Sequence, residues 1–242
     1  MSNLRDAIVR MALRRPYLYL LVTLVISIVL MEVLVEIAEH TFIKPALQQL
    51  ELQFIAYVQQ FVTPPLTAEV MLVTASGSST FYLLASALVC CWYLYSRQKD
   101  RLYLYLVCLC GGGILNQVLK RIFERVRPDI FPVIAESGYS FPSGHAMGAI
   151  CFYGILAYFA GLGLRSKPLR WGLMAAAGIY ILLIGLSRVY LGVHYPTDIL
   201  AGYAAGATWL FFVLRCIVFL ESVIKGAAAV VIKICFGFVY AK

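Results

Sequence analysis

The sequence contains few charged residues. Asp, Glu, Lys and Arg make up 13% of the chain and hydrophobic residues 62%, whereas a soluble globular domain is about half apolar and about a quarter charged. The apolar residues occur in runs of about twenty, which is long enough for a helix to cross a bilayer. This composition excludes an ordinary soluble domain. We expect one integral membrane domain over residues 1–242, with the lipid bilayer and not nucleic acid as its partner.

Groupings of metal-ligating side chains are also missing from the sequence pattern. The chain has only three histidines, and its seven cysteines all lie within apolar runs and not in loops at ligand spacing. No cluster of carboxylates suits Mg²⁺, and no Cys/His set suits Zn²⁺. We interpret the cysteines as small buried hydrophobic residues, and we expect neither a metal nor another cofactor.

The N-terminus lacks the pattern of a cleavable signal peptide. Arg10, Arg14 and Arg15 precede an apolar run that is too long for a signal core and has no small-residue cleavage site. We interpret this run as a signal anchor and as the first span of an all-α, six-helix membrane bundle. The expected spans are Tyr17–Ile37, Val70–Tyr95, Leu102–Leu119, Ala146–Leu164, Trp171–Leu186 and Ile199–Leu214.

The distribution of Lys and Arg predicts the orientation of these spans. Cytoplasmic loops are enriched in Lys and Arg, and one side of the predicted bundle carries fourteen of the twenty cations. That side, which holds both termini, is therefore expected to be cytoplasmic in a multi-pass protein of the cell membrane. The other side carries the remaining six, namely Lys44, Lys120, Arg121, Arg125, Arg127 and Arg188.

Three segments outside the spans have patterns of their own. Pro45–Val62 has apolar residues at helical spacing and a glutamine-rich opposite face that includes Glu51. We expect an amphipathic helix on the outer interface between spans 1 and 2, the alternative being a helix packed on the bundle. The apolar tail Gly226–Ala241 is expected to be a helix on the inner leaflet. The segment Ser76–Ser79 lacks the Walker pattern, so we interpret it as a polar break.

The remaining polar residues gather in three short stretches on the predicted outer side. The first is KRIFERVRP, residues 120–128. Lys120 and Arg127 are seven residues apart and are expected on one face of a helix, which Pro128 ends at Arg127. Two cations then lie at the mouth of the third span. Headgroup snorkelling is the alternative for such cations, and it is the interpretation we give to Arg121 and Arg125.

The second stretch is PSGH, residues 142–145. Ser143 is a good N-cap for the next helix, and Gly144 lets a phosphate approach the backbone closely. Exposed N–H groups at a helix start bind anions. His145 is therefore expected in the first turn, beside any phosphate held there, although a lone histidine is more often a hydrogen-bonded structural residue.

The third stretch is SRVYLGVHYPTD, residues 187–198. Gly192 is expected to end a helix after Arg188 in a left-handed turn, which brings His194 round. Asp198 follows in the first turn of the next helix. Its carboxylate can accept a hydrogen bond from one nitrogen of His194 and leave the other nitrogen free as a nucleophile. A carboxylate favoured by the helix dipole is the alternative for Asp198, and both can hold together.

Together the three stretches resemble the tripartite signature of the type 2 phosphatidic acid phosphatase family, in its bacterial membrane branch. The signature reads Lys, six residues, Arg-Pro; then Pro-Ser-Gly-His; then Ser-Arg, five residues, His, three residues, Asp. Every position is matched, with 13 residues between the first two motifs and 41 between the last two. The resemblance covers Lys120–Asp198.

The resemblance implies a phosphohistidine mechanism that needs no metal. It implies that His194 is the nucleophile, that Asp198 orients it, and that His145 is the general acid and then the general base. The phosphate ligands would be Lys120, Arg127, Ser143, Gly144 and Arg188.

Two other functions are compatible with a membrane protein that carries these cations. One is a protein that binds or flips lipid phosphates without hydrolysis, although such sites usually lie at the midplane and not at one interface. The other is an inactive scaffold, which intact His145, His194 and Asp198 argue against. The sequence does not distinguish phosphatidylglycerophosphate, phosphatidate and undecaprenyl diphosphate as substrates, and it gives no oligomeric state.

Overall fold

The structure is a computed structural model that describes residues 45–129 and 132–237, together with scattered positions between Leu18 and Ala38; the side chains of the last helix are described as far as Cys216. The backbone divides into two compact units. One, here called the main unit, is Leu30–Leu210, and the other combines Met1–Val29 with Phe211–Lys242. All three sequence motifs lie in the main unit. The prediction of one domain over residues 1–242 stays a prediction.

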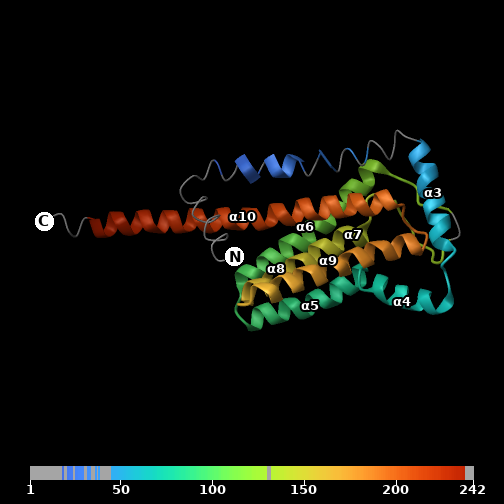
Figure 1. Ribbon diagram of the computed structural model, residues 1–242. Coiled ribbons are helices and arrows are strands. Elements are labelled where there is room, and N and C mark those ends of the chain that lie inside the picture. The colour runs from blue at the N-terminus through green and yellow to red at the C-terminus, as the bar shows by residue number, and fades with distance from the viewer. Residues whose placement is uncertain are drawn as a thin grey trace. The chain divides into compact units, whose positions relative to one another are not determined.

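The described residues form helices and no strand, so the predicted all-α class is confirmed (Figure 1). In Figure 1, α5, α6, α8 and α9 run alongside one another, and α3 crosses one end of them. The elements are α3 (Pro45–Gln59), α4 (Pro64–Ala75), α5 (Ser79–Tyr95), α6 (Lys99–Phe123), α7 (Gly144–Ala149), the π-helix η1 (Ile150–Gly154), α8 (Ile155–Gly163), α9 (Lys167–Tyr190) and α10 (Pro196–Gly237).

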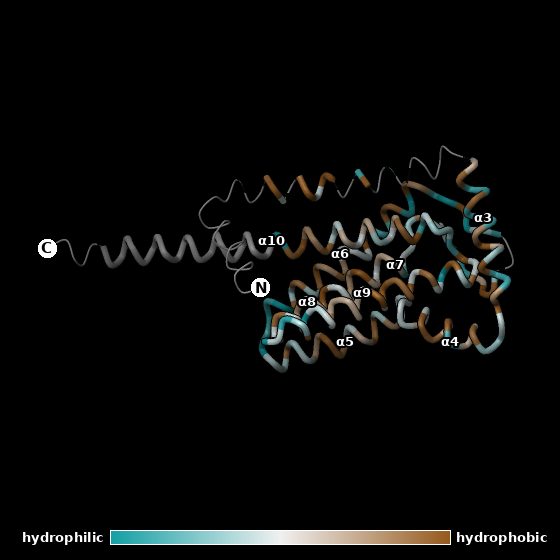
Figure 2. Tube along the Cα trace, in the orientation of Figure 1, coloured by the Kyte–Doolittle hydropathy of each residue, from teal (hydrophilic) through white to brown (hydrophobic). Residues whose placement is uncertain are grey.

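Four spans among the described residues are long and apolar enough to cross a membrane: Lys99–Phe123, Gly144–Gly163, Lys167–Tyr190 and Pro196–Cys216. The pair α4–α5 gives a fifth if it is counted as one bent span. Figure 2 shows apolar residues along the helix bodies and hydrophilic residues gathered at their ends. The first predicted span, Tyr17–Ile37, lies largely outside the described residues, so the count of six stays a prediction.

The second predicted span, Val70–Tyr95, is wrong as a single helix. It is the pair α4 and α5, bent by 50°. The expected polar break at Ser76–Ser79 is confirmed as the cause, because Ser78 caps α5 by accepting the Phe81 N–H at 3.1 Å. The Ser76 hydroxyl pairs with the Tyr180 hydroxyl of α9 at 2.7 Å, so the break is anchored inside the bundle.

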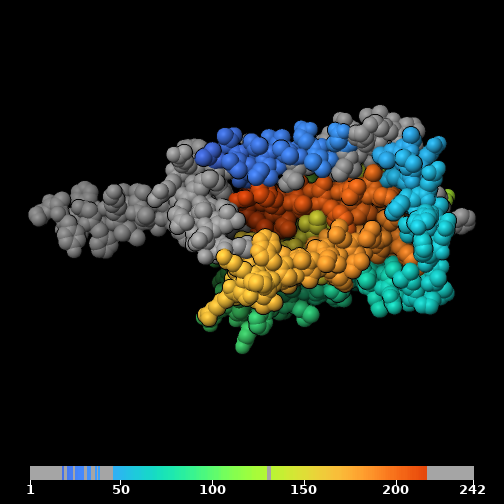
Figure 3. All heavy atoms as spheres, in the orientation of Figure 1, coloured from blue at the N-terminus to red at the C-terminus, as the bar shows by residue number. Residues whose placement is uncertain are grey.

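The predicted amphipathic helix is α3, which lies across one end of the main unit beside α4 (Figure 3). Ile55 is fully buried in a cluster with residues of α7, α9 and α10, whereas Phe54 and Tyr57 are exposed. The alternative, a helix packed on the bundle, is therefore also realised. The expectation that Glu51 lies on a water-facing side is wrong, because its side chain is only 4% exposed.

The last helix, α10, brings the third motif against the second. It packs closely on α7, since a Cβ on Gly202 would lie 2.7 Å from the Ser143 carbonyl oxygen. At its first turn the Ser143 N–H donates to the Asp198 carbonyl at 2.9 Å. The separate tail helix predicted at Gly226–Ala241 is wrong, because α10 continues without a break to Gly237; residues 238–241 lie outside the described residues.

Candidate active site

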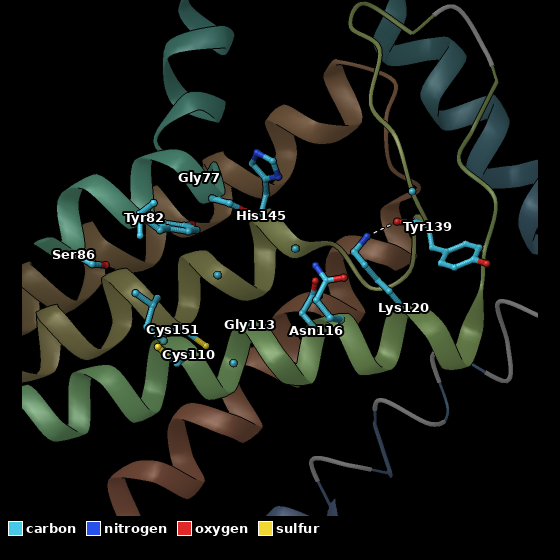
Figure 4. Close-up of a pocket in the computed structure, with 18 of the residues that line it drawn as sticks. Gly77, Tyr82, Ser86, Cys110, Gly113, Asn116, Lys120, Tyr139, His145 and Cys151 are labelled. Atoms are coloured by element: carbon cyan, nitrogen blue, oxygen red, sulfur yellow. Dashed lines mark hydrogen bonds between the residues drawn. The ribbon is translucent and has the colours of Figure 1, made fainter.

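The three motifs meet at one end of the main unit around a cavity of about 770 Å³ (Figure 4). Five of the eight predicted site residues line it: Lys120, Arg127, Gly144, His145 and His194. Of the other three, Arg188 pairs with the lining residue Glu136 and Asp198 with the lining residue His194. Ser143 precedes the lining residue Gly144 and bonds to the Asp198 carbonyl. The fold therefore brings together all the residues that the sequence singled out, and their roles stay proposals.

The first motif supplies two cations from different local structures. Lys120 is in the last turn of α6, and its ammonium group donates to the carbonyl of Tyr139 (Figure 4). The prediction that the helix continues to Arg127 is wrong. It ends at Phe123, because Glu124 adopts a left-handed conformation with φ of 45°. Arg127 follows in the loop, where Nε donates to the Gly138 carbonyl at 3.0 Å.

The second motif begins the fourth apolar helix, as predicted. Ser143 is the N-cap of α7, and its hydroxyl accepts the Ala146 N–H at 3.4 Å. Gly144 and His145 follow in the first turn and line the cavity. Figure 4 shows His145 on this first turn and Lys120 on the neighbouring α6, and both residues line the cavity.

The third motif turns back on itself in the way that its glycine predicts. α9 ends at Tyr190, and Gly192 has φ of 70°, a conformation that glycine adopts without strain. The Val193 N–H then bonds to the Arg188 carbonyl at 3.1 Å. This tight turn places His194 at the start of α10, which begins at Pro196 as expected.

His194 is held as a neutral imidazole with one nitrogen directed at a carboxylate. Its Nδ1 lies 3.3 Å from Oδ2 of Asp198, and its Nε2 lies 3.1 Å from Nη1 of Arg127. Burial lowers the pKa of His194 to about 3, outweighing the raising effect of Asp198. The ring is therefore uncharged at neutral pH. With the Nδ1 proton facing Asp198, Nε2 carries the lone pair that a nucleophile needs.

Asp198 has no exposed surface, and its two oxygens accept from several donors. Oδ2 accepts from the Ser140 hydroxyl and, at 2.9 Å, from the Tyr195 N–H. Oδ1 accepts from Nη1 of Arg125 at 2.6 Å. These contacts fix the orientation of the carboxylate and, through it, of His194.

Arg125 is a residue that the sequence reasoning missed. Its interpretation as a snorkelling cation is wrong, because the side chain is 8% exposed and bridges Asp198 and Glu51. Its guanidinium also lies 3.8 Å from the ring centre of Tyr195. The sequence did contain one signal for this role of Arg125. Glu51 is the only acidic residue on the glutamine-rich face of the α3 sequence.

Arg188 is 2% exposed, and two further missed residues hold it. Its Nη1 donates to the Thr74 hydroxyl of α4 at 2.7 Å. Its Nη2 forms an ion pair with Glu136, whose other carboxylate oxygen lies 3.3 Å from Nη2 of Arg127. Two of the predicted phosphate ligands thus share one carboxylate of the chain. A phosphate that binds both arginines has to take the place of that carboxylate.

The described residues contain cations at the site but no set of metal-binding side chains. Among the described residues, no set of three or more His, Cys, Asp or Glu side chains is placed to hold a metal ion. The described cysteines are all free, and Cys108 and Cys151 are buried as predicted, whereas Cys91 and Cys110 are exposed on the main unit. A reaction that needs no metal stays a prediction.

Comparison with known proteins identifies relatives over the region that contains the site. The model of the PAP2 superfamily matches residues 101–221. A phosphatidylglycerophosphatase B of Bacillus subtilis is 40% identical over 157 residues, which cover 64% of this chain and 76% of the relative. An undecaprenyl-diphosphatase of Sulfolobus acidocaldarius is 33% identical over 111 residues, covering 45% of this chain and 48% of that protein.

A solved structure shares the fold of most of this chain. The crystal structure of the PAP2-type phosphatidylglycerolphosphate phosphatase of B. subtilis matches with a TM-score of 0.73 and 32% identity. The match covers 78% of this chain and 94% of that one. Together with the apolar helices, it establishes this chain as a multi-pass membrane protein.

Proposed function

The chain belongs to the PAP2 superfamily, and from this premise we propose that it is a membrane enzyme that hydrolyses the phosphomonoester or diphosphate of a lipid. The observation that carries the proposal is the buried pair of His194 and Asp198, with Nδ1 of the histidine facing the carboxylate and Nε2 at a cation-lined cavity. A protein that only binds or flips lipids has no need of an oriented, uncharged imidazole in that position.

The reaction proceeds in two displacements. Nε2 of His194 attacks phosphorus, the bond from phosphorus to the leaving oxygen breaks, and His145 donates a proton to that oxygen. His145 then takes a proton from water, whose oxygen attacks the phosphohistidine. The phosphorus–nitrogen bond breaks, inorganic phosphate leaves, and His194 returns to its neutral form. Asp198 stabilises the positive charge on the ring in between.

The cations of the site stabilise the phosphoryl group. Lys120, Arg127 and Arg188 supply positive charge to the equatorial oxygens, where charge spreads in the transition state. Ser143 and Gly144 lie at the start of α7 and contribute backbone N–H donors, because the first N–H groups of a helix have no partner within it. These fixed donors take the part that Mg²⁺ plays in many phosphoryl-transfer enzymes.

The shape of the cavity favours a lipid substrate. Beyond its polar end the lining continues along α5 and α6 with apolar side chains that include Leu83, Ala87, Leu106 and Leu109. Apolar walls suit an acyl or prenyl chain, whereas the cations suit its phosphate. Only 13 residues separate the first two motifs, so no further domain is inserted between them. Phosphatidylglycerophosphate, phosphatidate and undecaprenyl diphosphate all fit this description.

Purified protein is expected to release phosphate from at least one of these lipids, and the release should persist in excess EDTA and be inhibited by vanadate. The reason is a site made of Lys, Arg and His side chains. The measurement is phosphate release from a panel of the three lipids in mixed micelles, with and without EDTA. Binding of the lipids without phosphate release would favour the flipping protein. Activity lost in EDTA and restored by Mg²⁺ would exclude the metal-free mechanism.

We further propose that both termini are cytoplasmic and that the site faces the opposite side of the cell membrane. The excess of Lys and Arg on the predicted cytoplasmic side supports this orientation. A cysteine at the exposed position Ser137, in the loop of the site, should react with an impermeant thiol reagent in intact cells. One at exposed Ser166, between α8 and α9, should react only after lysis. The reverse pattern would overturn the orientation, and the unsubstituted chain is the control.

A further inference from the structure

Helix α3 lies before the segment that the family model matches, yet it sends a carboxylate into the network of the site. The matched segment begins at residue 101, and α3 is Pro45–Gln59. Glu51 is 4% exposed and makes three polar contacts. It pairs with Nη2 of Arg125 at 2.7 Å and accepts from the N–H of Thr197 at 2.9 Å and from its hydroxyl at 2.6 Å.

The position of Arg125 makes this carboxylate relevant to the chemistry. One Nη of Arg125 holds Glu51 and the other holds Asp198, so a single guanidinium connects α3 to the carboxylate that faces His194. Each carboxylate lies within hydrogen-bonding distance, and all three side chains are nearly free of solvent. Electrostatic interactions among buried groups are screened little by salt or water.

The charges of this chain of contacts explain why a second carboxylate is needed. Asp198 and Arg125 alone sum to −1 + 1 = 0, and a neutral pair does little to stabilise an imidazole that becomes positive when Nε2 bonds to phosphorus. Glu51 brings the sum to −1 + 1 − 1 = −1. This group of three side chains on the Nδ1 side of His194 then carries one net negative charge, while the guanidinium keeps Asp198 in place and Arg127 lies on the Nε2 side.

We infer that Glu51 is a positioning residue of the reaction, which balances the charge of Arg125 and so keeps Asp198 able to stabilise the phosphorylated His194. Glu51 contacts neither His194 nor the cavity, and it acts through Arg125 and Thr197. This inference rests on the proposed function. It also makes α3, which carries no family motif, part of the active enzyme.

The test is the isosteric change Glu51→Gln in the full-length protein, assayed with a soluble phosphate ester and with the lipid panel. We expect kcat to fall by about tenfold, which corresponds to the loss of about one charge-assisted hydrogen bond. KM should change less than twofold, because Glu51 touches no substrate. Glu51→Asp, which keeps the charge, should recover part of the loss. In a protein that already carries Arg125→Met, adding Glu51→Gln should not lower kcat any further.

Two control variants separate this role from simple anchoring of α3. Gln59→Ala removes another contact of α3, the bond from Nε2 to the Tyr190 carbonyl at 3.0 Å, and should leave kcat within twofold of the original. Glu69→Gln removes an exposed negative charge from α4 and should do the same.

The inference is overturned if Glu51→Gln keeps full kcat, changes only KM, or loses no more than Gln59→Ala. These outcomes count only when the unsubstituted enzyme is active. An inactive unsubstituted protein would instead contradict the proposed function.

Discussion

Replacement of His194 by alanine is expected to abolish phosphate release, with a loss of at least about 10⁴-fold in kcat. In the proposed mechanism Nε2 is the atom that forms the bond to phosphorus, and the ring of His194 lies between Asp198 on its Nδ1 side and Arg127 on its Nε2 side. Rapid quench of the unsubstituted enzyme with labelled substrate should trap phosphate on His194. The measurement is the position of the label after proteolysis of the quenched protein.

His145→Ala is the matched control, since it removes the other imidazole of the cavity. It should lose less activity on substrates with good leaving groups, because such groups depart without a proton.

The low pKa of His194, about 3, also predicts that protonation of His194 does not limit activity above about pH 4. In the quench experiment, phosphate trapped on His145 would show that His145 is the nucleophile and His194 the general acid and base.

The parts of the site that the sequence predicts without the family resemblance are those that local geometry decides. His194 and Asp198 are four residues apart, with Gly192 before them to turn the chain and Pro196 between them to start a helix. Ser143 likewise caps the helix that it precedes. Each of these features depends on a few neighbouring residues, so their types and spacing are sufficient.

The parts that the sequence does not predict come from contacts between distant segments. Arg125 and Glu51 are 74 residues apart, and Arg188 and Thr74 are 114 apart. An arginine next to a membrane has the same local pattern whether it snorkels or bridges two buried carboxylates. Only the packing of α3 across the end of the main unit decides between them.

Two helix boundaries were predicted only in part, for a related reason. The polar break at Ser76–Ser79 was expected, but the 50° bend that divides residues 70–95 into two helices was not. Serine is compatible with a helix, and the contact of its hydroxyl with Tyr180 of α9 comes from a distant segment. At the end of α6, Pro128 correctly forbids a helix beyond Arg127. The helix ends earlier, because Glu124 adopts a left-handed conformation. This conformation is uncommon for residues other than glycine, and no glycine stands there to predict it.

Asp198→Asn is expected to reduce kcat by about 10³-fold or more while keeping the shape of the side chain. The amide oxygen can still accept from Arg125, but the amide nitrogen then faces Nδ1 of His194 as a donor. Nδ1 becomes an acceptor, and the ring proton moves to Nε2, the nitrogen that attacks phosphorus in the proposed mechanism.

The measurement is kcat for a soluble ester and for the preferred lipid, with the folded state checked by thermal unfolding in detergent. The unfolding check is needed because Arg125 loses its charged partner in this variant. The loss should be the same for good and poor leaving groups, since the step affected is the attack and not the departure. A folded Asp198→Asn enzyme that keeps a tenth of the original kcat would show that Asp198 does not set the tautomer of the nucleophile.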